Sequence, residues 1–469
     1  MKILPVLFTL VATFPVLSFQ PRASADEFAD VASSYGSVRN VIGVHQTSTN
    51  NPDGTGTNFW VPAFEGAPAN SVALSNPHMA QADAFGNLYI ADKTSHSILK
   101  ITPNGLLHTL AGTHVAGFNG DGPAIADTLQ LNNPNGLFVF PDGTVYLLDP
   151  GNRRIRRIGT DGVMTTILTD PEPDWYPSGR GLWVSPDRQL IYYTNEFAPL
   201  FIGGPAQGAV VKKWTPSGGI EVVCSKPVGF TNPANLAVNP VDGKLYVTDR
   251  AEEDTSKIAP GLFRIDGPDQ RTRMTGNITQ QAAADGQLAV NSYIDGPRGI
   301  AFLPNGAYFL CGHRDGNVWY VDTAGVLHRY IRGRGTKDYY NLANGLHPPL
   351  LGFAPNGQEW MCQPRAVSLA PNGNLICVSN DSGFIFSVNN AAPPSLPVDF
   401  RPVRRVVDGL HLTWSGKFGR GYLVERSSEL QPQNWQIIGA AGGPGSLIEF
   451  IDPAAMGLAH AFYRLESSY

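Results

Sequence analysis

One position recurs along the chain with side chains suited to binding a negatively charged group. It opens a run of apolar residues, and in most copies it directly follows a proline. A guanidinium group at this position offers a planar fork of N–H donors that matches a carboxylate, sulfate or phosphate. If the runs surround one axis, the arginines among them predict an anion site. The residues are His78, Asn135, Arg180, Ala234, Arg298 and Arg365.

A second set of polar residues closes the next apolar run, and we expect it on the same face of the fold. It consists of Asp92, Asp149, Asn195 and Asp249. Two interpretations stay open. The carboxylates either pair with the arginines, which leaves no positive charge for a ligand, or cap the turn that follows each strand, as aspartate commonly does.

The elements that must hold these residues form an internal repeat. Residues 76–101 and 133–158 both run from a proline through an apolar strand, a glycine turn, a second strand ending in aspartate, a polar turn and an alternating third strand. Another glycine turn and a fourth strand follow. Such a unit predicts one four-stranded antiparallel sheet. Further copies begin near Arg180, Pro233, Pro297 and Pro364.

The sixth copy lacks a fourth strand, because a proline-rich stretch begins at residue 391. Residues 38–43 (VRNVIG) match residues 108–112 (HTLAG), where the fourth strand of the first copy ends. A strand from the N-terminal side that completes the last sheet would close a ring and remove an open sheet edge. The sequence therefore predicts an all-β fold, with a six-bladed β-propeller over residues 36–390 closed by an N-terminal strand.

Residues 105–168 resemble the NHL-repeat family. The resemblance rests on the connection GFNGDGPA and on a core that reads PNG, DGTVY, D and NRRIRRI in order. It implies the propeller fold. Members of this group range from binding scaffolds to amidating-type lyases, streptogramin-type lyases and calcium-dependent lactonases, so function has to be argued from the site.

The same resemblance bears on metals. Amidating lyases carry zinc-binding histidines at the recurring position in three blades, whereas this chain has only His78 there, and one imidazole does not make an open three-ligand site. A lactonase-type calcium site needs converging oxygen ligands. Asn135, Asn195, Asp149 and Asp249 offer such ligands, but a first-strand glutamate is missing and the arginines repel a cation. We predict no cofactor, with calcium as the less favoured alternative.

Residues 117–122 resemble a cation loop but are expected to be an ordinary connection.

The N-terminal residues predict a location outside the cytoplasm. A basic start, an apolar run over residues 3–19 and the small-residue pattern ASA at 23–25 predict a signal peptide, residues 1–25, that is cleaved after Ala25. A periplasmic, cell-surface or extracellular location follows, with no membrane span after cleavage. The net charge of -5 gives no indication of a nucleic-acid partner.

The pattern changes after a proline-rich linker at residues 391–397. Short alternating strands are expected at 410–414, 422–427, 435–438, 447–451 and 461–465. Residues 398–469 resemble the fibronectin-III or immunoglobulin-like modules of bacterial exported proteins, with Trp414 and Tyr463 as core residues. The module is either a spacer or an anchor to the cell surface.

Two further features complete the predicted face. Cys311 and Cys362 are expected on it in neighbouring blades, so that they either form a disulfide or remain buried thiols. Long connections extend a basic and aromatic rim, with solvated loop charge as the alternative. Its residues are Arg271, Arg273, Arg332, Arg334, Lys337, Tyr339 and Tyr340.

The function predicted from these residues is binding. The channel mouth and the loops around it are expected to take a protein, a peptide or an anionic saccharide. The alternative is a metal-dependent propeller enzyme, a lactonase-like hydrolase or a lyase, that uses the same mouth.

Overall fold

The structure, a computed structural model, describes the chain in segments. These are residues 35–43, 56–171, 180–195, 210–224, 230, 233–250, 260–276, 280–331, 364–380, 383–390, 399–400, 403–407, 409–415, 421–428, 436–442, 447–458 and 461–467. Regular structure in these segments is β-strand, apart from short 3₁₀ turns. The predicted all-β class is confirmed.

Strands that follow one another in sequence pair into antiparallel sheets over the first half of the chain. The first sheet holds β2 (Pro77–Ala82), β3 (Leu88–Asp92), β4 (Ser97–Ile101) and β5 (Leu107–Ala111). The second holds β7 (Gly136–Val139), β8 (Val145–Asp149), β9 (Arg154–Ile158) and β10 (Val163–Thr169), with β6 (Ala124–Ile125) at its edge. The third holds β11 (Leu182–Val184), β12 (Ile191–Asn195), β13 (Val210–Thr215) and β14 (Gly219–Cys224).

The pattern continues in the second half. The fourth sheet holds β15 (Pro233–Val238), β16 (Leu245–Asp249), β17 (Gly261–Gly267) and β18 (Gln270–Arg273). The fifth holds β21 (Pro297–Phe302), β22 (Tyr308–Gly312), β23 (Val318–Val321) and β24 (Leu327–Ile331). The sixth holds β25 (Pro364–Leu369), β26 (Leu375–Ser379), β27 (Phe384–Asn390) and β1 (Tyr35–Ile42). A short parallel pair, β19 (Gln281–Ala282) and β20 (Ser292–Tyr293), precedes the fifth sheet.

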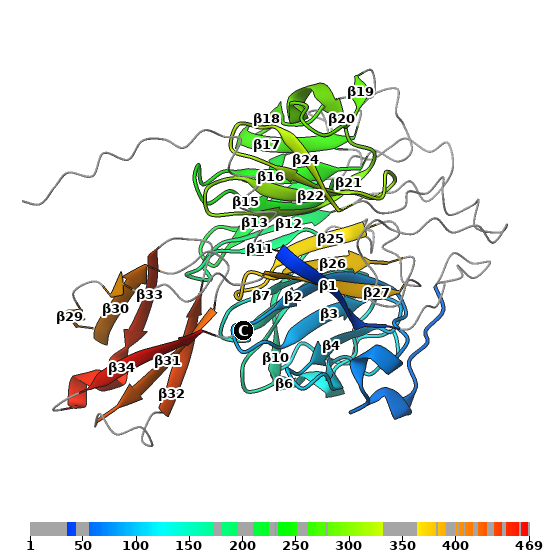
Figure 1. Ribbon diagram of the computed structural model, residues 1–469. Coiled ribbons are helices and arrows are strands. Elements are labelled where there is room, and N and C mark those ends of the chain that lie inside the picture. The colour runs from blue at the N-terminus through cyan, green and yellow to red at the C-terminus, as the bar shows by residue number, and fades with distance from the viewer. Residues whose placement is uncertain are drawn as a thin grey trace, which may run out of the picture.

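The sheets are arranged around a common axis (Figure 1). The first strand of each sheet contacts the first strands of two others, in the order β2, β7, β11, β15, β21, β25 and back to β2. This arrangement is a β-propeller, with these first strands along the central channel.

Tight turns with a shared chemistry join the first and second strands of the sheets. Asp83 Oδ1 accepts the backbone N–H groups of Phe85 and Asn87, at 2.9 and 2.8 Å. Asp142 does the same for Thr144 in the second sheet, at 2.8 Å. A residue at positive φ completes these turns, a glycine such as Gly143 with φ 86° in the second sheet and Arg188 with φ 60° in the third. The aspartate and glycine types of the repeat therefore fix the hairpins locally.

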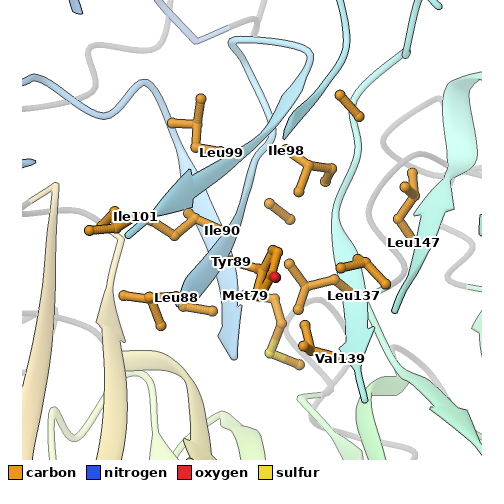
Figure 2. Packing of buried hydrophobic residues seen from close by; sticks show 14 of the residues in the cluster. Met79, Leu88, Tyr89, Ile90, Ile98, Leu99, Ile101, Leu137, Val139 and Leu147 are labelled. Carbon is orange, nitrogen blue, oxygen red and sulfur yellow. The ribbon is translucent and has the colours of Figure 1, made fainter. Parts of the chain in front are cut away.

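Apolar side chains fill the space between adjacent sheets. Figure 2 shows this packing between the first and second sheets. Met79 and Ile90 from the first sheet and Leu137 and Leu147 from the second are at most 3% exposed and share one cluster. The second strand of five sheets is buried at every residue, namely β3, β8, β16, β22 and β26, so these strands are covered on both faces. The outer strands differ, since β18 alternates between exposed and half-buried residues.

β1 lies at the outer edge of the sixth sheet, antiparallel to β27, with Val38 opposite Val388. The residue after it, Gly43, has φ +110°, and a Cβ there would lie 2.2 Å from the carbonyl oxygen of Gly383. Gly112, which directly follows β5, has φ +92°, and a Cβ there would lie 2.3 Å from the carbonyl oxygen of His96. The two glycines thus have the same role, which explains the sequence match between residues 38–43 and 108–112.

The C-terminal strands form two sheets. One contains β28 (Asp399–Phe400), β29 (Arg404–Val406), β30 (Gly409–Ser415) and β33 (Leu447–Asp452), and the other β31 (Gly421–Ser427), β32 (Gln436–Gly442) and β34 (Phe462–Ser467). Trp414 is fully buried in their common core, and Tyr463 packs against that core with its hydroxyl donating to Asp452 at 2.8 Å. The expected strands and both core residues are confirmed. The predicted signal peptide and linker lie outside the described residues.

Candidate functional site

The recurring position of the sequence lies at the opening of the inner strands. His78, Arg298 and Arg365 are the second residues of β2, β21 and β25. Asn135 directly precedes β7, and Arg180 lies two residues before β11. Because these strands contact one another around the ring, their opening residues gather at one end of the channel, which we call the cationic end. His78, Arg180 and Arg298 are only 2%, 0% and 3% exposed.

Asn135, which directly precedes β7, holds the His78 ring in one orientation. Its Nδ1 hydrogen-bonds to Asn135 Oδ1. An amide oxygen only accepts, so Nδ1 carries the proton and Nε2 carries a lone pair. Nε2 is buried, and no described residue hydrogen-bonds to it. The site therefore presents a buried, oriented hydrogen-bond acceptor.

The surroundings keep the His78 ring neutral. Burial is the main cause that lowers its pKa well below the usual 6.5, and the charges of Arg365, Arg180 and Lys93 lower it further. The hydrogen bond with Asn135 opposes this shift. Charge from Arg365 and Arg180 thus acts on one ring from two different sheets. The fold brings His78, Asn135, Arg180 and Arg365 close together, with Arg298 on the adjoining strand β21.

This environment predicts an acid-sensitive stability. Below about pH 6.5 the His78 ring is protonated in the unfolded chain but stays neutral in the folded protein, because its pKa is lowered there. The unfolded state therefore binds more protons, and the free energy of unfolding decreases as the pH falls. We expect the melting temperature of the wild type to drop more between pH 8 and pH 5 than that of His78→Gln. The other histidines are common to both proteins and cancel in the difference. If the melting temperatures of the two proteins fell equally between pH 8 and pH 5, the His78 ring would not be held neutral in the folded state.

The second polar set caps turns where its contacts are known. Asp92 accepts the backbone N–H groups of Ser75 and Asn76, at 3.0 and 2.6 Å. Asp149 accepts the Asn132 N–H at 2.7 Å and pairs with Arg156 of β9, Nε to Oδ2, at 2.9 Å. Burial raises the Asp149 pKa to about 6, against the charge of Arg156. These contacts favour the capping interpretation for both residues. Asn195 and Asp249, also buried, end β12 and β16.

Some residues of interest were not visible in the sequence pattern. Arg156 lies in a strand where arginines alternate with isoleucines, and its residue type alone does not predict that it forms a buried ion pair. Asn235 stands one position after Ala234, so the alignment passed it over. It is 2% exposed, and its Nδ2 has no hydrogen-bond partner among the described residues.

Two expectations need correction. Arg271 and Arg273 do not belong to a loop at the rim. They lie in β18, the outer strand of the fourth sheet, with their guanidinium groups over the Phe263 ring at 4.2 and 4.5 Å. Of the two alternatives for Cys311, the disulfide is not formed: Cys311 is a free, buried thiol, and its Sγ accepts the Gly299 N–H at 3.0 Å. Outside the described residues lie Cys362, Arg332, Arg334, Lys337, Tyr339 and Tyr340.

The loop at residues 117–122 makes internal contacts of a structural kind. Asn119 Oδ1 accepts the Gln130 N–H at 2.7 Å, and Asp121 pairs with Arg154 at 2.7 Å. In the described part of the chain, no three His, Cys, Asp or Glu side chains are grouped as a metal site. Nor does any described helix have the length and apolar character to span a membrane.

Comparisons with known proteins give distant likenesses. No family model matches the chain. Teneurin-m of Drosophila melanogaster is 24% identical over 229 residues, which are 41% of this chain and only 8% of that protein. An auxiliary nutrient-binding protein from Bacteroides ovatus has a TM-score of 0.49 at 11% identity, over 76% of this chain and 77% of that one. A streptogramin B lyase has a TM-score of 0.42 at 15% identity, over 68% and 95%. Likenesses at this level carry no inference about activity.

Proposed function

We propose that the chain is an exported NHL-type propeller whose six sheets are six blades, with β1 closing the last one. The closed order of contacts among the inner strands and the pairing of β1 with β27 support this architecture. The apolar run and ASA pattern of residues 1–25 support export. The two C-terminal sheets form a module of the fibronectin-III or immunoglobulin-like kind.

The function is binding of an anionic ligand at the cationic end of the channel. The observation that carries this proposal is the His78 ring, which sits buried within the influence of Arg365 and Arg180. Like charges gathered in a buried place repel one another, and an anion between them lowers that energy. Arg298 and Asn135 belong to the same end. Guanidinium forks bind carboxylate and sulfate oxygens well.

His78 narrows the ligand class. Its Nε2 accepts a hydrogen bond, so a matching ligand donates one from a group near its anionic end. A hydroxylated acid has this combination, since its carboxylate faces the arginines and a neighbouring hydroxyl reaches Nε2. A carboxylated saccharide is therefore the ligand class that fits, in preference to a simple dicarboxylate.

Calorimetric titration with oligogalacturonate tests this proposal. We expect binding by the wild type, and none by neutral galactose oligomers of equal length. Arg365→Ala should weaken binding about 10- to 100-fold, because a hydrogen bond to a charged group contributes about 1.5–3 kcal/mol. Arg329→Ala, which removes an exposed arginine of β24, is the matched control and should bind as the wild type does. Equal affinities in the two variants would refute the cationic end as the site.

The second candidate function is catalysis by a lyase at the same cationic end. The specific observation is the neutral imidazole with a lone pair on Nε2, which is the form that a general base requires. In a uronide, Nε2 would take the proton from the carbon next to the carboxylate, and the electron pair of that C–H bond would form a C=C double bond to the neighbouring carbon. The glycosidic oxygen on that neighbouring carbon would leave with its bonding pair and take a proton from water. An unsaturated product that His78→Gln abolishes, with binding retained, would favour this lyase over the binding protein.

A further inference from the structure

A cavity of about 490 Å³ lies in the channel beyond the cationic end. Its walls are the middle and final residues of the inner strands and the turns that follow them, from Met79 in β2 round to Pro371 after β25. None of the opening residues of the strands, such as His78 or Arg298, lines it. The cavity therefore belongs to the opposite end of the channel, away from the site proposed above.

The lining of this cavity is apolar and uncharged. Four aromatic side chains contribute to it: Phe138, Phe140, Trp183 and Phe302. The other lining residues are Met79, aliphatic residues, prolines, two amides and a serine, and none carries a charge. A cavity of this size with aromatic walls is suited to a small molecule of low polarity and excludes an ion, which would lose its hydration there.

The few polar groups in the lining are nearly all engaged. Gln81 Oε1 accepts the Val139 N–H at 2.8 Å, and Ser368 Oγ donates to the Ala80 carbonyl at 2.7 Å. Asn235 differs. Its Oδ1 accepts the Leu236 N–H at 2.8 Å, whereas its buried Nδ2 has no hydrogen-bond partner among the described residues. A buried N–H group without an acceptor is costly. Asn235 belongs to the cavity lining, so a ligand acceptor that reaches its Nδ2 would remove this cost.

We propose that this cavity is a second ligand site, for a neutral aromatic compound that carries a carbonyl group. The ring system packs between Phe138, Trp183 and Phe302, and the carbonyl oxygen accepts a hydrogen bond from Asn235 Nδ2. The inference stands independently of the anion site, because the two sites have different residues and opposite preferences for charge.

Prodan, a neutral naphthalene with a propionyl group, tests the proposal through its fluorescence, which rises in apolar surroundings. We expect saturable binding by the folded wild-type chain. Ala237→Phe, which adds bulk to the lining, should weaken prodan binding at least tenfold. Val241→Phe adds the same ring at an exposed position that does not line the cavity and should leave binding unchanged. Ala82→Phe, from β2, serves as a second filling variant if Ala237→Phe does not fold.

Asn235→Asp tests the hydrogen bond. It keeps the oxygen that accepts the Leu236 N–H but removes the Nδ2 donor. The wild type should bind prodan at least fivefold more tightly than 2-dimethylaminonaphthalene, which lacks the carbonyl, and the variant should lose this preference. An equal preference in the variant would overturn the role of Asn235. Failure of the wild type to bind prodan saturably, or full binding by both filling variants, would overturn the site.

Discussion

Replacing Lys212 with methionine is expected to lower the free energy of unfolding by about 3–5 kcal/mol, the cost of breaking a buried ion pair. Lys212 lies in β13 and is 4% exposed. Its Nζ donates to both carboxylate oxygens of Asp170, at 3.0 and 2.8 Å, and the Tyr193 hydroxyl donates to the same carboxylate at 2.8 Å. Methionine fills a similar volume but leaves the Asp170 carboxylate buried without its cation. Urea denaturation followed by circular dichroism measures the loss.

The next residue supplies the matched control. Lys213 pairs with Glu221 at 3.0 Å, but the two side chains are 35% and 52% exposed. Water screens this pair, so Lys213→Met should cost no more than about 1 kcal/mol. Similar losses in the two variants would mean that Lys212 is solvated. The double variant Lys212→Met, Asp170→Leu should recover much of the stability, because it removes both charges from the interior.

The ion pair shows where sequence reasoning stops. Most of the hairpin turns were predictable because an aspartate or asparagine and a nearby glycine determine them locally, as the adjacent residues Asp142 and Gly143 do. The cationic end was predictable because the repeat aligns one residue from each sheet. Lys212 lies in β13 of the third sheet, whereas Asp170 directly follows β10 of the second sheet, so only the fold brings them together. Arg156 and Asp149 pair in the same way.

The inner strands show a second limit. In a strand buried on both faces, alternation does not tell which side chain faces the channel and which packs between sheets. Nothing in the sequence pattern distinguishes Phe138 and Trp183 from core residues, yet they line the cavity. The pairing register also shifts at the start of several inner strands, as between Pro233 and Leu236. Such a bulge changes the direction of the side chains that follow it. An alignment made by counting residues from the proline therefore did not select Asn235.

Shortening Ile42 to alanine should lower the free energy of unfolding by about 2–5 kcal/mol, as expected for a large side chain removed from a packed core. Ile42 is fully buried, lies opposite Ile385 of β27, and belongs to the cluster that also contains Ile90 and Leu137. Its contribution therefore depends on β1 being docked in the sixth sheet. If β1 were a loose N-terminal extension, this side chain would be in water and the change would be nearly neutral.

Ile125→Ala is the control, since Ile125 is 53% exposed in the edge strand β6 and should cost no more than about 0.5 kcal/mol. A large difference between the two variants would place β1 in the ring in solution. Equal, small losses would contradict the closed ring and leave β27 as an open edge. The comparison matters for function because His78 lies on β2, which packs directly against β25 of the sixth sheet. A ring that opens at β1 would loosen the sheet that holds Arg365, so Ile42→Ala should also weaken oligogalacturonate binding, whereas Ile125→Ala should not.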